Sequence, residues 1–221
     1  MQPARDAVIA KIAEVIDKTV NTFFEYDIDI KVGFVGYRDV TDSERYKIIP
    51  WVDCMDIKSF TDQLTGCPCT GGGDAPEDVL GGMDQALKQL FDIPNGGTSS
   101  LHADPSTRNI PVVFHLGDAP HHGPIFSSCA DSHPQLQDSP RAYTEILDDF
   151  AANKIDYYFT QLDRSTDQMS RMFKDTFDNN QRRNNNFQVL DFTSLNIDTV
   201  FEGFRSGLSR SVMSHMNKAA K

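Results

Sequence analysis

Two segments of the 221-residue chain share the sequence Gly-Asp-Ala-Pro, at residues 73–76 and 117–120. Glu77 and Asp78 extend the first segment, and Asp118 stands inside the second. Asp and Pro are ordinary turn residues, so one such segment alone indicates a turn. Two occurrences, each placing carboxylates in a loop beside a regular element, predict a binding site. Carboxylate oxygens are hard ligands, so the favoured ion is of the magnesium type.

The elements that flank these segments predict that the carboxylates meet. An apolar run at 112–117 indicates a strand, and Asp118 follows it directly. In an open α/β sheet, ligands bind outside the carboxyl ends of the strands. Residues 76–91 predict a helix, with Asp74 as its cap and Glu77 near its positive end. Asp118 and Glu77 should therefore converge on one edge of the sheet.

Hydrophobic periodicity along the chain predicts the fold class. Strand patterns cover 28–37, 46–52, 155–162 and 187–192, and helix patterns cover 3–25, 57–65, 141–153, 166–177 and 195–212. Pro50 restricts its strand to an edge of the sheet, where antiparallel pairing is expected. Because strands and helices alternate, we predict an α/β fold, with a doubly wound, mostly parallel sheet, one antiparallel edge strand and helices on both faces.

Two details refine this prediction. The helix at 76–91 has one apolar face that should lie in the core, formed by Leu80, Met83, Leu87 and Leu90. The alternation also predicts a strand before the helix at 3–25, and the sequence contains none there.

The composition limits the partners and the compartment. A formal net charge of −11 argues against nucleic acid or an anionic membrane as the partner. A hydrophobic fraction of 39% supports one packed domain over residues 1–221. No apolar stretch reaches the roughly 18 residues of a membrane span. Four cysteines are too few for a disulfide scaffold, which favours a reducing, cytoplasmic setting. An upstream signal would instead direct the chain out of the cell.

Five motifs, in order along nearly the whole chain, resemble those of a von Willebrand factor type A domain. The motifs are Val-Gly-Phe-Val-Gly-Tyr-Arg-Asp at 32–39, Gly-Gly-Gly-Asp-Ala-Pro-Glu-Asp at 71–78, Gly-Asp-Ala-Pro-His-His-Gly at 117–123, Asp-Ser-His-Pro at 131–134 and Ile-Asp-Tyr-Tyr-Phe at 155–159. The closest resemblance is to the subgroup of these domains found beside alpha-kinase domains. The Asp-Ala-Pro-Glu stretch at 74–77 is also similar to a segment of integrin beta subunits.

The resemblance implies a metal-ion-dependent adhesion site, which in this family holds magnesium at the top of the sheet. By position, Asp118 matches the third ligand element, and Glu77 with Asp74 matches the second. The first element, an Asp-x-Ser-x-Ser loop after the first strand, has no counterpart and would immediately precede residue 1. We therefore expect a single domain, truncated before its first helix and lacking its first central strand. With so few fixed oxygens, it should bind magnesium weakly.

The function implied is a non-catalytic protein–protein interaction module within a larger protein or assembly. The resemblance implies no enzyme activity for this region, although an alpha-kinase domain could be attached elsewhere in the full-length protein. Arg38 and Asp39 end a strand on the edge that carries Asp118, and with His121 and His122 they are candidates for the rim that contacts a protein partner.

Other functions remain open at this point. One alternative is a metal-dependent hydrolase that uses Asp118, His121 and His133. Another is a structural component of a large complex. His and Cys are the usual ligands of zinc, and a zinc site could be drawn from the residues of one loop: His121, His122, Cys129, Asp131 and His133. Their spacing matches no closed zinc module, so magnesium at Asp118 is the first expectation.

Overall fold

The computed structural model describes residues 30–68, 70, 72–91, 110–179, 187–191, 202–203, 205–207 and 209–213. The helix predicted at 3–25 lies outside the described residues, as does nearly all of the loop at 92–110. Within the described ranges, no helix is long and apolar enough to cross a membrane. The cysteines that the structure describes, Cys54, Cys67 and Cys129, are free thiols.

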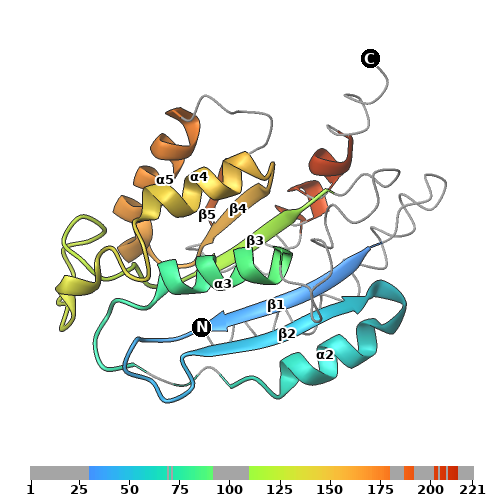
Figure 1. Cartoon of the computed structure of the whole chain (residues 1–221), viewed down its shortest axis with the longest axis horizontal. Coiled ribbons are helices and arrows are strands. Elements are labelled where there is room, and N and C mark those ends of the chain that lie inside the picture. The colour runs from blue at the N-terminus through green and yellow to red at the C-terminus, as the bar shows by residue number, and fades with distance from the viewer. Residues whose placement is uncertain are drawn as a thin grey trace.

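The described strands form two sheets, and Figure 1 shows them side by side. Strands β1 (Lys31–Tyr37) and β2 (Tyr46–Asp53) pair antiparallel. Strands β3 (Val112–Gly117), β4 (Asp156–Gln161) and β5 (Phe187–Asp191) form a parallel sheet in that order. The predicted α/β architecture with an antiparallel strand is therefore confirmed.

Helices cover the strands on more than one side. The α-helices are α2 (Ile57–Thr65), α3 (Val79–Phe91), α4 (Tyr143–Ala152) and α5 (Asp167–Asn179). Short 3₁₀ helices occupy Cys54–Asp56, Pro134–Leu136 and Arg164–Thr166. Helix α2 contacts the β1–β2 pair, α3 contacts β1 and α4, and α5 contacts β4 and β5.

Strand β4 lies at the centre of the core, because all six of its residues are buried. On one face, the Tyr157 ring lies 5.1 Å from that of Phe150 in α4. On the other face, the Tyr158 hydroxyl donates to the carbonyl of Gly207, which belongs to a further helical segment. The predicted apolar stripe of α3 is also buried, at Leu80, Met83, Leu87 and Leu90. Each such side chain contributes about 1.5–3 kcal/mol on burial.

Helix α3 begins later than predicted, at Val79 rather than at residue 76, and Asp74 does not cap it. The backbone N–H of Glu77 donates to the carbonyl of Pro120 at 2.9 Å, so this segment is held extended against the loop after β3. The capping role falls to Asp78, whose Oδ1 accepts a 3.1 Å hydrogen bond from the Gly81 N–H. This geometry is that of an N-cap.

Side chains link the two sheets. Between β1 and β3, the strands that the structure describes share no backbone ladder. The Tyr37 hydroxyl lies 2.6 Å from Nε2 of His115, and Nδ1 of His115 lies 2.5 Å from the Tyr157 hydroxyl. Burial lowers the pKa of His115 to about 3, so the ring is neutral and one nitrogen donates while the other accepts. The central strand expected from the sequence would belong between these sheets, and that expectation stays a prediction.

We expect Tyr37→Phe to destabilise the fold by about 1–3 kcal/mol, because it leaves a buried nitrogen of His115 without its partner. Tyr143→Phe is the matched control, since among the described residues the Tyr143 hydroxyl is in no hydrogen bond while its ring packs against Phe126. Urea unfolding of both variants measures the difference. Equal losses in the two variants would show that the link contributes nothing specific.

Candidate functional site

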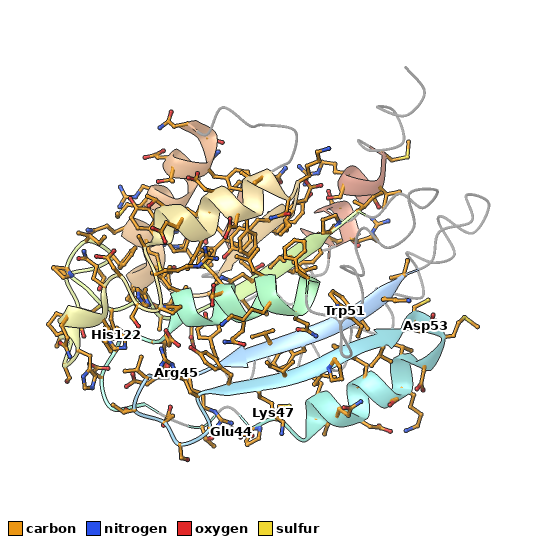
Figure 2. The ribbon with its side chains drawn as sticks, viewed as in Figure 1. Glu44, Arg45, Lys47, Trp51, Asp53 and His122 are labelled. Atoms are coloured by element: carbon orange, nitrogen blue, oxygen red, sulfur yellow. The ribbon has the colours of Figure 1, made fainter. Side chains whose placement is uncertain are left out.

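Three loops meet at one edge of the molecule, where β1 and β3 end. The Asp78 N–H donates to the carbonyl of Arg38 at 3.2 Å, and the Glu77 N–H donates to the carbonyl of Pro120 at 2.9 Å. These bonds join the loop before α3 to the loops after β1 and β3. Figure 2 labels Arg45 and His122 at this end of the molecule, with Trp51 and Asp53 toward the other end of the β1–β2 pair.

Carboxylates from all three loops gather around Glu77. Burial, and then the negative charges of Asp39, Asp42 and Asp118, raise the pKa of Glu77 to about 7. In the described part of the chain, Glu77 Oε2 and Asp42 Oδ2 are buried and accept no hydrogen bond. We call Asp39, Asp42, Glu77 and Asp118 the acidic cluster. The structure brings Glu77 close to Asp118, and whether they bind a metal stays a prediction.

Asp78 is next to Glu77 in sequence, but its charge is compensated. Its side chain is fully buried, and Oδ2 accepts hydrogen bonds from Arg45 Nε at 2.6 Å and from the Tyr46 hydroxyl at 2.5 Å. Burial, followed by this hydrogen bond to Asp78 and its charge, raises the pKa of Tyr46. A carboxylate paired in this way stabilises the structure and offers no free oxygen to an ion.

His122 lies between two carboxylates below the surface. Its Nε2 is 3.1 Å from Asp39 Oδ1 and its Nδ1 is 2.9 Å from Asp131 Oδ1, with the His122 side chain fully buried. Asp131 also accepts the N–H groups of Gly123 at 2.6 Å and His133 at 2.8 Å. Although burial raises the pKa of Asp131, the hydrogen bonds with His122 and with the N–H groups of Gly123 and His133 hold it below its ordinary value.

The His121 ring contacts backbone carbonyls of the loop before α3 and of the long loop after β3. Its Nδ1 lies 3.3 Å from the carbonyl of Glu77, and its Nε2 lies 3.1 Å from the carbonyl of Leu136. Burial lowers the pKa of His121 to about 4, so the ring is neutral at pH 7. His133 is half-buried, with its ring 5.7 Å from that of His122.

The residues predicted to form the partner-binding rim divide into two groups. Arg38 is near the surface, and its guanidinium bonds the Glu44 carboxylate and the Pro68 carbonyl, each at 3.1 Å. Asp39 is 1% exposed, and His121 and His122 are 0% exposed. These three side chains are therefore buried in this structure, and whether this edge contacts a partner stays a prediction.

Asp74 lies beside His122 and Asp131. Its Oδ2 accepts the Ser132 N–H at 2.5 Å, and its Oδ1 is buried and, among the described residues, has no hydrogen-bond partner. One ligand atom from each of Asp74, His122 and Asp131 lies within 4.8 Å of the others.

Sequence reasoning missed Asp42 and Arg45. Asp42 follows β1, and carboxylates that follow strands are the ones expected at a binding edge, so that position could have identified it. No local signal marks Arg45 as the partner of Asp78, because the two are far apart in sequence and the fold alone brings them together.

Comparison with known proteins gives one relevant similarity and no family assignment. No protein-family model matches the chain. The chain is similar to alpha-protein kinase vwkA of Dictyostelium discoideum, with 31% identity over 192 residues. The alignment covers 84% of this chain but only 28% of the kinase, so the chain spans less than a third of that protein. The predicted link to alpha-kinase proteins is confirmed at this level, and the type A assignment stays a prediction.

Glu77 should make stability depend on pH in a defined direction. Its pKa is raised from 4.5 to about 7 in the folded protein, so folding favours its protonated form. In the presence of a chelator, this contribution should be fully present below pH 4.5 and be lost as the pH rises through about 7. We therefore expect Glu77→Gln to be more stable than the native chain above pH 7, with the difference shrinking toward pH 4.5.

Urea unfolding of both chains across this pH range measures the effect. Glu44→Gln is the control, because Glu44 is exposed and hydrogen bonds from Arg38 lower its pKa. A stability difference between Glu77→Gln and the native chain that does not change with pH would contradict the assignment.

Proposed function

We propose that the chain is a non-catalytic protein–protein interaction module of the von Willebrand factor type A class. The observation that carries the proposal is the uncompensated negative charge at the edge where β1 and β3 end. Glu77 and Asp42 each bury a carboxylate oxygen that finds no donor in the described parts of the chain. Buried carboxylates without partners are costly, so an edge built this way suits a cation or a basic group from outside.

The donor set fits magnesium. Every side chain whose negative charge acts on Glu77 is a carboxylate, and magnesium prefers oxygen ligands. Glu77 and Asp118 would hold the ion, which would supply an open coordination position for a carboxylate of the partner. Asp39 and Asp42 would add negative charge nearby, which strengthens attraction for the cation. With few fixed protein oxygens, affinity should be in roughly the millimolar range.

The larger setting also belongs to the proposal. Similarity to part of a protein named as an alpha-protein kinase suggests a module that brings partners to a kinase domain elsewhere in a longer polypeptide. The partner would be a protein that presents a carboxylate or a complementary surface to this edge. The net charge of −11 disfavours nucleic acid and anionic membranes.

The hydrolase alternative is supported less well. It needs His121 as a catalytic group, yet both ring nitrogens of His121 lie near backbone carbonyls and its side chain is fully buried. With Nε2–H donating to the Leu136 carbonyl and Nδ1 accepting from the Leu80 N–H at 3.5 Å, the neutral ring has no nitrogen left for a substrate. Metal-dependent phosphoester hydrolysis that disappears in His121→Ala would overturn the interaction module as the main function. A purely structural role in a complex would show neither turnover nor cation dependence.

We expect Asp118→Ala to abolish magnesium binding and Glu77→Gln to weaken it at least tenfold, because each removes one of few charged ligands. Asp62→Asn, on the exposed face of α2, is the control and should bind as the native chain does. Calorimetric titration with magnesium measures all four proteins. Native affinity in Asp118→Ala would remove Asp118 from the site.

Partner binding should depend on the same ion. We expect proteins captured from a cell extract by the native chain in magnesium to be released by chelator and to be absent with Asp118→Ala. Asp62→Asn should retain them, since its substitution lies away from the edge. If neither chelator nor Asp118→Ala reduces the capture of these proteins, the interaction surface lies elsewhere.

A further inference from the structure

A second group of ligand-type side chains lies beside the acidic cluster. Asp74, His122 and Asp131 come from the loop before α3 and the long loop after β3. One ligand atom from each lies within 4.8 Å of the others. This group contains an imidazole nitrogen in addition to carboxylate oxygens, so its chemistry differs from that of an all-oxygen site.

The contacts of His122 cannot all be satisfied by a neutral ring. A neutral imidazole carries one N–H, so it can donate to Asp39 or to Asp131 but not to both. The second nitrogen then faces a carboxylate oxygen as one acceptor faces another, which is unfavourable unless a proton or a metal ion lies between them. The closeness of His122 to both carboxylates therefore points to a positive charge at one of the two contacts.

Asp39 is suited to accept a hydrogen bond from the single N–H of a neutral His122 ring. It is 1% exposed and accepts hydrogen bonds from the Val40 N–H at 2.5 Å and the Thr41 hydroxyl at 3.2 Å, which fix its carboxylate. With the proton at Nε2 directed to Asp39, the Nδ1 lone pair of His122 is directed toward Asp131. Histidines that bind metals usually donate their other N–H to a carboxylate in this manner.

The distances on the Nδ1 side fit a shared ion. Ligands of zinc lie about 2.0–2.2 Å from the metal, so two of them in a tetrahedral shell are about 3.3 Å apart. His122 Nδ1 and Asp131 Oδ1 are 2.9 Å apart, close to that spacing. Asp74 adds a buried Oδ1 that, in the part of the chain that the structure describes, accepts no hydrogen bond.

We propose that Asp74, His122 and Asp131 bind a divalent transition metal of the zinc class, with Asp39 as the carboxylate that orients His122. The imidazole favours zinc over magnesium and calcium, which prefer oxygen-only shells. Asp131 also lines a cavity of about 300 Å³, together with Gly123 and Cys129. The bound ion would tie the loop after β3 to the loop before α3.

The test is a zinc titration of the 221-residue chain after treatment with a chelator. We expect one zinc per chain with micromolar or tighter affinity, and a rise in melting temperature on binding. His122→Ala and Asp131→Asn should each weaken binding at least a hundredfold, and Asp39→Asn should weaken it 10- to 100-fold. Asp138→Asn removes an exposed carboxylate from the same loop and should leave binding unchanged.

Two further variants test the zinc site by other routes. Asp74→Asn alters a half-buried residue and serves where His122→Ala does not fold, and it should weaken zinc binding at least tenfold. Glu77→Gln should weaken magnesium binding at least tenfold but keep zinc, which distinguishes this site from the magnesium site and allows either proposal to fail alone.

Cobalt in place of zinc reports the ligand types, because thiolate ligands give an intense charge-transfer band. We expect that band to be absent and Cys129→Ser to bind normally. A thiolate band, or zinc affinity unaffected in His122→Ala and Asp131→Asn, would overturn the assignment. Zinc affinity weaker than millimolar in the native chain would overturn it as well.

Discussion

The buried contact of His122 with Asp39 and Asp131 is the constraint on which the edge of this molecule depends. It joins the loop after β1 to the long loop after β3. Asp39 is buried and Asp131 is half-buried, so a positive charge between them stabilises the contact, since unpaired buried charges are strongly unfavourable. Asp39 also acts on Glu77, so the charge near His122 influences the acidic cluster. The geometry of one site is therefore linked to the charge state of the other.

The neighbouring carboxylates of Glu77 and Asp78 have different surroundings. Asp78 is paired with Arg45 and Tyr46 and caps helix α3, so it holds the helix in place. Burial, and then the negative charges of its neighbours, raise the pKa of Glu77 to about 7. Because elevated carboxylate pKa values collect at functional sites, the contrast supports the proposal that Glu77 binds a ligand while Asp78 has a structural role. Sequence position alone does not separate the two.

Regular periodicity allowed the described strands, the helices and the apolar face of α3 to be predicted from sequence, because burial imposes a repeating pattern. Helix α3 was placed too early, since the contact of Glu77 with Pro120 competes with the first turn and has no local signal. The edge holding Glu77 and Asp118 followed from the rule that strand ends form sites. The burial of His122 could not be predicted, because loop histidines are more often exposed and only tertiary contacts show that this one is enclosed.

Two sets of contacts join the half of the molecule that contains β1 and β2 to the half that contains β3, β4 and β5. Deep between the sheets, Tyr37 meets His115 through side chains. At the edge, the backbone N–H of Asp78 donates to the carbonyl of Arg38, and the His122 ring contacts the Asp39 carboxylate. Asp39 and Asp42 belong to the β1 half, whereas Asp118 belongs to the β3 half. A shift of one half against the other would therefore change the spacing of the carboxylates around Glu77. If the proposed cation binds there, it would stabilise the arrangement in which they are close, and by linkage any partner that favours that arrangement would raise the affinity for the cation.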